Sequence, residues 1–150
     1  MYPSHNDAAQ PLAHHPREPV PLMSSVPAGF PSPAEDHTES NLDLTRRFIR
    51  HPTSTFFVRV TGESLTGIGI LPDDYLAVDR SHTPHHGDVV IALVQGSFTA
   101  KRYLCTPQQG VELAAANPNY PNVPWEDGCE IWGVVTSVHR DLLTRGGNYA

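Results

Sequence analysis

The stretch HGDVVIALVQGSFTAKRYL, residues 86–104, decides the fold class of this chain. Two runs rich in β-branched and aromatic residues, 88–94 and 97–104, flank the dipeptide QG. A two-residue link of this kind joins antiparallel strands through a tight turn, in which Gly96 can adopt the positive φ that the turn requires. The stretch therefore predicts a β-hairpin. Its second strand contains Lys101, the only lysine of the chain.

Four further segments have the composition of short strands, and each is bounded by glycine, proline, asparagine or aspartate. They are FFVRV (56–60), YLAVD (75–79), VELAAA (111–116) and EIWGVVTSVH (130–139). Six short strands in close succession predict a mostly β, antiparallel domain that is curled or barrel-like. A short helix is expected over 42–50, LDLTRRFIR, where apolar residues recur at helical spacing until HP at 51–52 ends it.

The first 40 residues differ in composition from the rest. They contain eight of the chain's 15 prolines and few large apolar side chains. Proline removes backbone donors, and the scarce apolar surface does not offset the entropy lost on ordering the chain. We therefore expect residues 1–40 to form a flexible, extended N-terminal arm and residues 41–150 to form a single domain.

Charge and apolar runs restrict the class of protein. The formal net charge is −6, which argues against a chain that grips the nucleic-acid backbone by itself, because phosphate binding needs a basic face. The first residues do not have the pattern of a signal peptide, and the longest apolar run, 89–94, is far shorter than the roughly 20 residues that span a bilayer. Cys105 and Cys129 indicate no disulfide framework. We expect a cytoplasmic protein with no direct sequence-specific DNA binding and no membrane segment.

Ser64 is a candidate nucleophile. It follows a predicted strand and lies in a turn that also contains Gly62, Gly67 and Gly69. In such a turn a hydroxyl is exposed, and neighbouring backbone N–H groups can face a developing oxyanion. A serine in a glycine-rich turn is more often structural, however, so the turn alone does not assign catalysis.

Lys101 is the candidate general base. A lysine accepts a proton only when its amine is neutral, which requires its pKa to fall from about 10.4 to roughly 7–8. Burial against apolar strands can lower the pKa of a lysine, whereas an arginine effectively stays charged. The other nine basic residues are arginines, so a lysine at position 101 fits a role that needs deprotonation. At this point it stays open whether the single lysine lies at position 101 by chance, without a catalytic role.

The histidines do not predict a metal site. His82, His85 and His86 cluster in the turn SHTPHHGD, 81–88, but a convincing fourth ligand is missing. Solvated loop histidines are the preferred interpretation. We expect neither a metal ion nor another cofactor.

Over residues 27–143 the sequence resembles the LexA/UmuD family of self-cleaving Ser–Lys peptidases. Several separate, colinear motifs carry the resemblance: AGFPSPAED, LDLTRRFIRHPTSTFFVRVTGESL, DDYLAVDRS, HGDVVIALVQGSFTAKRYL and IWGVVTSV. The resemblance implies a curled antiparallel β domain of the β-clip type with one short helix. It also implies that Ser64 is the nucleophile, that Lys101 is the general base, and that the scissile bond joins Ala28 to Gly29. Leu65 departs from the family pattern, which commonly has methionine there.

The resemblance further implies a two-stage protein of the SOS response. Intact chains, as homodimers, would be latent until DNA damage builds a RecA filament on single-stranded DNA, which promotes self-cleavage. The product 29–150 would then be an accessory subunit of a UmuC-type Y-family DNA polymerase in error-prone translesion synthesis, the basis of SOS mutagenesis.

Three alternatives stay open. The first is a polymerase-binding module whose Ser–Lys dyad is vestigial and does not cut. The second is a phage-type repressor, for which the 28 proline-rich residues before the cleavage site are too short to hold a DNA-binding domain. The third is a trans-acting processing peptidase such as a signal peptidase, which would need a membrane anchor or an apolar surface loop.

Overall fold

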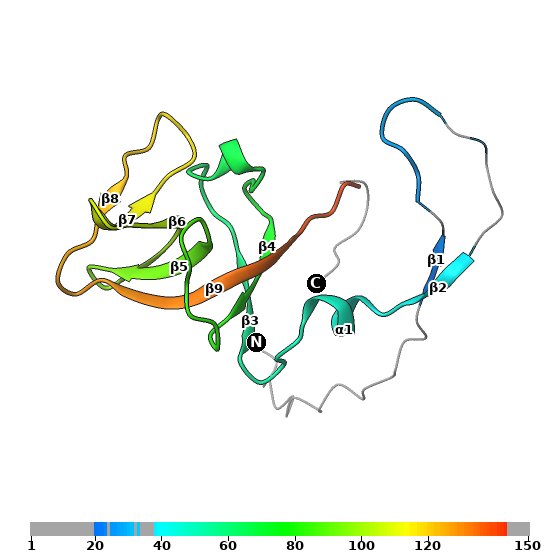
Figure 1. Ribbon diagram of the computed structural model, residues 1–150, viewed down its shortest axis with the longest axis horizontal. Coiled ribbons are helices and arrows are strands. Elements are labelled where there is room, and N and C mark those ends of the chain that lie inside the picture. Colours follow the sequence, from blue (N-terminus) through cyan, green and yellow to red (C-terminus); the bar gives the residue numbers. More distant parts are fainter. Residues whose placement is uncertain (1–19, 24, 32, 34–37, 144–150) are drawn as a thin grey trace, which may run out of the picture. The chain divides into compact units, whose positions relative to one another are not determined.

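The structure is a computed structural model that describes residues 20–23, 25–31, 33 and 38–143. The chain divides into a first unit that ends at Arg47 and a second unit that begins at Phe48. Figure 1 shows the elements of both units. The boundary expected from the sequence, between residues 40 and 41, lies close to this division but stays a prediction.

The first unit contains a two-stranded antiparallel sheet. Strand β1 (Val20–Met23) pairs with β2 (Thr38–Leu42), in a register that sets Val20 opposite Leu42. Helix α1 (Leu44–Phe48) begins in this unit, and the carboxylate of Asp43 accepts a hydrogen bond from the Arg46 N–H (3.2 Å), as an N-capping residue does. The helix is shorter than the span 42–50 expected from the sequence. Leu42, the first residue of the expected span, belongs to β2.

The second unit is built on one antiparallel sheet of seven strands. The strands are β3 (Thr55–Arg59), β4 (Tyr75–Asp79), β5 (Val89–Val94), β6 (Ser97–Thr106), β7 (Gly110–Ala114), β8 (Val123–Pro124) and β9 (Glu130–His139). Their order across the sheet is β3-β4-β9-β5-β6-β7-β8. Strand β9, the last that the structure describes, therefore lies between β4 and β5 and joins two halves of the sheet, as the long orange strand in Figure 1 shows.

The pairing of β9 is irregular on both sides. The register shifts between Ala77 and Val78 in the β4–β9 pair and between Ile91 and Ala92 in the β5–β9 pair. Such shifts bend a strand and increase its twist, so the sheet curls instead of lying flat. Gly133 of β9 fits this crossing, because a Cβ there would meet the Val78 side chain at 2.6 Å.

The sheet buries apolar side chains on both faces of β5. Ile91 packs in one cluster with Leu65, Ile70, Leu76 and Val78, whereas its neighbours Val90 and Ala92 pack in another with Leu113 and Val134. A strand that is covered on both faces needs an unbroken apolar sequence, which explains the run VVIALV. This strand supports β6, the strand that contains Lys101.

The fold class expected from the sequence is confirmed. The described residues form a mostly β, antiparallel structure with a single short α-helix, and all six predicted strands are present. The predicted tight turn is also found, with positive φ at Gln95 (49°) and Gly96 (79°). No helix in the described part of the chain is long and apolar enough to cross a membrane.

Candidate active site

Ser64 lies in the turn between β3 and the 3-10 helix η1 (Thr66–Ile68). Residues that follow β7 hold this turn in place. The Ser64 carbonyl accepts a hydrogen bond from the Ala116 N–H (2.7 Å), and the Glu63 carbonyl accepts one from the Asn117 side-chain amide (2.9 Å). Two carbonyls of the turn are thus anchored to a distant loop, which fixes where the Ser64 hydroxyl points.

Gly67 makes this anchoring possible. Its N–H donates to the Ala116 carbonyl (2.7 Å), and a Cβ at position 67 would lie 2.3 Å from that oxygen. Only glycine allows the two backbones to approach so closely. The glycine-rich sequence around Ser64 therefore has a packing reason at this position.

Lys101 lies in the middle of β6, where it pairs with Val90 of β5. Its side chain is buried, with only 8% of the residue exposed. Its Nζ lies 3.0 Å from Ser64 Oγ, within hydrogen-bond distance. The structure therefore brings together the two residues that the sequence singled out, although 37 positions separate them.

The surroundings of Lys101 favour the neutral amine. Burial lowers the pKa of Lys101 below its ordinary value, because desolvation penalises the ammonium form. A neighbouring carboxylate would have the opposite effect, but Lys101 forms no ion pair with any residue that the structure describes. A neutral amine at hydrogen-bond distance can accept the hydroxyl proton of Ser64.

Both residues open into a cleft of about 360 Å³. Its walls include apolar side chains from β3 to β6, among them Val58, Leu76, Ile91 and Phe98. Strand β3 borders the cleft and is an edge strand of the sheet, so an extended peptide could pair with it while its side chains enter the cleft.

A backbone donor is available beside the Ser64 hydroxyl. Among the residues that the structure describes, none accepts a hydrogen bond from the Ser64 N–H. A free N–H at a nucleophilic serine can stabilise the oxyanion of a tetrahedral intermediate. The arrangement thus brings a serine hydroxyl, a buried amine and a backbone N–H with no described acceptor together at one cleft.

Comparison with known proteins agrees with this geometry. The sequence model of the family described as Peptidase S24-like matches residues 21–136. The chain belongs to this family. It is a serine peptidase of the LexA/UmuD type, a self-cleaving family related to the SOS response, as the resemblance noted in the sequence implied.

Relatives in the S24-like family cover most of the chain. Protein ImpA of Salmonella typhimurium is 46% identical over 114 residues, which are 75% of this chain and 78% of that protein. Protein SamA of Salmonella typhimurium strain LT2 is 43% identical over 134 residues, 85% of this chain and 94% of that protein. The LexA repressor of Clostridium kluyveri is 31% identical over 121 residues, 81% of this chain but 59% of the repressor.

The expected cleavage site of this S24-like chain lies in the first unit. Ala28 and Gly29 are both exposed, in the segment that connects β1 to β2. An exposed bend with small side chains is accessible to a peptidase. The role of this bond stays a prediction, as do the catalytic roles of Ser64 and Lys101.

Sequence reasoning missed the residues that position the S24-like site. Ala116 and Asn117 lie more than 50 positions after the turn that they hold, and no motif in the sequence pointed to them. It also missed a buried ion pair. The Arg140 guanidinium donates to both oxygens of the fully buried Asp74 carboxylate (2.6 Å each) and to the Gly69 carbonyl (2.7 Å). This network joins the end of β9 to the loop that follows η1.

Proposed function

We propose that the chain is a self-cleaving serine peptidase that cuts its own Ala28–Gly29 bond. One observation carries the proposal: the buried amine of Lys101 lies 3.0 Å from the Ser64 hydroxyl, and burial lowers its pKa. A charged lysine would bind the hydroxyl without activating it, whereas a neutral one can remove its proton.

The chemistry would proceed through an acyl-enzyme. Ser64 Oγ attacks the Ala28 carbonyl carbon while Lys101 Nζ takes the hydroxyl proton, and the Ser64 N–H stabilises the oxyanion. As the bond to Gly29 breaks, Lys101 returns the proton to the departing amine. Water, deprotonated by Lys101, then hydrolyses the ester and releases the segment 1–28.

A tethered substrate suits this site. The scissile bond belongs to the same polypeptide as the nucleophile, so a high effective concentration replaces ordinary substrate binding. Alanine and glycine, with their small side chains, can approach the nucleophile closely. The same dyad could act within one chain or between the two chains of a homodimer.

Membership of the S24-like family supports a role of this chain in the SOS response beyond self-cleavage. In this proposal a RecA filament on single-stranded DNA stimulates the cytoplasmic homodimer to cut itself. The product 29–150 then acts as an accessory subunit of a UmuC-type, error-prone translesion polymerase. The similarity to ImpA and SamA over more than 110 residues supports this role.

Intact-mass spectrometry tests the proposed chemistry. We expect wild type at about pH 10, or at pH 7.5 with a RecA filament, to yield the fragments 1–28 and 29–150. Lys101→Arg should lose about 10²–10⁴-fold in rate, the usual contribution of a general base, and Ser64→Ala, which cannot form the acyl-enzyme, should stay whole. Ser97→Ala, a serine at the start of the same strand as Lys101, should cut normally. Ala28→Asp should stay whole with the dyad intact.

Two results would contradict the proposal. A wild-type chain that stays whole under all these conditions would favour a polymerase-binding module that does not cut. Fragments that persist in Ser64→Ala would point to a contaminating protease.

A further inference from the structure

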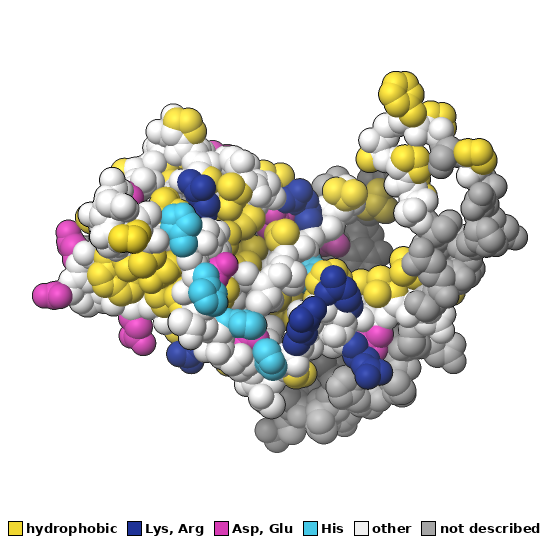
Figure 2. Space-filling view, viewed as in Figure 1, with side chains coloured by type: hydrophobic (Ala, Val, Ile, Leu, Met, Phe, Trp, Pro, Cys, Tyr) yellow, Lys and Arg dark blue, Asp and Glu magenta, His cyan; other side chains and the backbone are white. Residues whose placement is uncertain are grey.

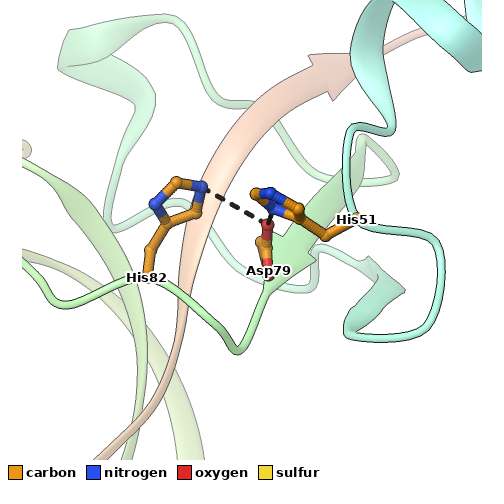
Figure 3. Close-up of side chains that lie close together, drawn as sticks. All are labelled: His51, Asp79 and His82. Atoms are coloured by element: carbon orange, nitrogen blue, oxygen red, sulfur yellow. Dashed lines mark hydrogen bonds and ion pairs between the residues drawn. The ribbon is translucent and has the colours of Figure 1, made fainter.

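Three side chains outside the cleft converge at the end of β4. His51 lies in the segment that precedes β3, Asp79 is the last residue of β4, and His82 lies in the turn that follows it. Asp79 Oδ2 is 2.6 Å from His51 Nδ1 and 3.3 Å from His82 Nε2. Figure 3 shows both rings on the same side of the carboxylate, directed toward it. We call these three residues the His–Asp–His cluster.

The carboxylate of the cluster is held in one orientation. Asp79 is almost fully buried, with 2% of the residue exposed. Its Oδ1 accepts hydrogen bonds from Ser54 Oγ (2.7 Å), Ser81 Oγ (2.7 Å) and Ser81 N–H (2.8 Å). These bonds leave Oδ2 to face the two imidazoles. Metal sites are typically built this way, with outer hydrogen bonds that orient a ligating carboxylate.

The separation of the His82 and Asp79 ligand atoms fits a transition-metal ion, whereas His51 lies closer to the carboxylate, at hydrogen-bond distance. Zinc binds imidazole nitrogen and carboxylate oxygen at about 2.0–2.2 Å, so two ligand atoms on a tetrahedral ion lie about 3.3 Å apart. The separation of His82 Nε2 from Asp79 Oδ2 has this value, and all three ligand atoms lie within 4.8 Å of one another. An ion would need only a small outward movement of His51, whose side chain is half exposed.

The charge and exposure of the site also suit a cation. The side chains of His51 and His82 are 49% and 47% exposed, so water could complete the coordination. The neighbouring Arg80 does not compete for the carboxylate. Its guanidinium lies over the Trp132 ring, 4.7 Å from the centroid, and its Nε donates to the Trp132 carbonyl.

We propose that His51, Asp79 and His82 bind a divalent transition-metal ion, zinc above all. Two neutral imidazoles and one carboxylate are ligands that zinc prefers, with water in the remaining position. The bound ion would link the chain entering β3 to the turn after β4 and so stabilise the second unit. This site is separate from the Ser64–Lys101 dyad and does not depend on the proposed cleavage.

The other histidines of the turn provide a contrast. Figure 2 shows histidine side chains gathered on the visible face of the second unit. His86 Nδ1 accepts a hydrogen bond from the Cys105 N–H (3.0 Å), and the His85 side chain is 86% exposed, with Nδ1 3.9 Å from Asp88. His82 therefore belongs to the cluster, and His85, from the same turn, does not.

Metal titration of the full chain tests the site. Ser64→Ala serves as the background, so that the chain stays whole. In this background, His82→Ala is compared with its matched control, His85→Ala. Zinc binding is measured by calorimetry, and Co²⁺ reports the coordination through its visible absorption. Both variants keep the histidines of residues 1–40, so binding there cannot produce a difference between them.

We expect the background chain and His85→Ala to bind one zinc ion with equal affinity at the cluster. His82→Ala should bind it about 10-fold more weakly or worse, since even the loss of an outer hydrogen-bond partner costs about 10–100-fold. Zinc should raise the melting temperature of the first two proteins but not of His82→Ala, and the Co²⁺ bands should weaken in parallel. Equal zinc affinity and equal melting shifts in all three proteins, or no binding in any of them, would overturn the proposal.

Discussion

Lys101 shows how much a single side chain can depend on its surroundings. The same amine in water would be protonated at neutral pH. Here the neighbouring strand β5 and the residues that line the cleft leave only 8% of Lys101 exposed to solvent. Lys101 forms no ion pair with the described residues, and its Nζ lies 3.0 Å from Ser64 Oγ, within hydrogen-bond distance. The residue is thus placed to act as a base.

The lowered pKa of Lys101 predicts the pH dependence of self-cleavage. In the proposed mechanism the reactive form is the neutral amine, whose share grows as the pH rises through the pKa of Lys101 in the folded protein. The rate should therefore rise about tenfold per pH unit and then level off, at a pH below the ordinary value of about 10.4. The rate of formation of 29–150 between pH 6 and 10.5 measures this profile.

The free energy of unfolding should also depend on pH through Lys101. Between the pKa of Lys101 in the folded chain and its higher value in the unfolded chain, the unfolded state binds more protons, so stability rises with pH. Circular dichroism at each pH separates this effect from the rate. A rate that stayed level from pH 6 to 10.5 in a folded protein would contradict a lysine base.

The sequence could single out Ser64 and Lys101, which the structure brings together, but not the residues that position them. Ser64 stands out by its turn, and Lys101 by its chemistry and by being the single lysine. Ala116 and Asn117 are ordinary loop residues, and their bonds to the Ser64 turn arise only when the sheet brings distant segments together. Pairing across such separations has no local pattern from which it could be read.

At the scale of elements, strand composition predicted the sheet where apolar runs are long. The six predicted strands each combine β-branched residues with turn residues at their ends. Strands β1, β2 and β8 escaped prediction because their sequences, VPLM, TESNL and VP, contain proline or polar residues and are defined by pairing instead. The position of β9 between β4 and β5 was likewise not evident, since order in a sheet is a tertiary property.

The turn that contains Ser64 provides a prediction at this scale. Gly67→Ala would place a methyl group 2.3 Å from the Ala116 carbonyl, so the turn must move away from the loop that anchors it. We expect a loss of about 1–3 kcal/mol in the free energy of unfolding, as for overpacking, and a fall in self-cleavage of about 10-fold or more, since small misplacements of reacting groups are costly. Thermal melts and intact-mass kinetics measure the two effects.

Gly133→Ala is the control for this prediction. Its Cβ would meet the Val78 side chain at 2.6 Å, so it also overpacks the second unit, but it does not touch the Ser64 turn. At a temperature where both variants are folded, only Gly67→Ala should cut slowly. Equal rates for the two variants would show that the Ala116 contact does not position the nucleophile.

At the scale of the whole second unit, an ion pair with a buried carboxylate links the residue after β9 to the residue before β4. Arg140 follows β9, and its partner Asp74 lies just before β4 with no exposed surface. The hydrogen bonds from Arg140 lower the pKa of the Asp74 carboxyl below its ordinary 3.8, against the effect of burial. A carboxyl with a lowered pKa stabilises the fold above pH 3.8 and loses this contribution as the pH falls.

Arg140→Gln should therefore destabilise the protein at pH 7, because it leaves a buried carboxylate without its charged partner. Arg59→Gln is the matched control, since it breaks the exposed Arg59–Asp73 pair, with side chains 61% and 75% exposed. Surface pairs contribute about 0–1 kcal/mol, so the control should melt close to wild type. Thermal melts should show a large difference between the variants at pH 7 and a smaller one below about pH 4. Equal melting temperatures at pH 7 would contradict the role of the pair.

The position of β9 in the sheet also has a consequence during translation. The proposed cleavage site leaves the ribosome before Ser64 and Lys101, and β9, which joins their halves of the sheet, is made after all of them. A nascent chain thus carries the proposed scissile bond, Ser64 and Lys101 before it contains the strand that joins the two halves of the sheet. In the proposed mechanism, this order of synthesis keeps the growing chain from cutting itself until β9 has been made.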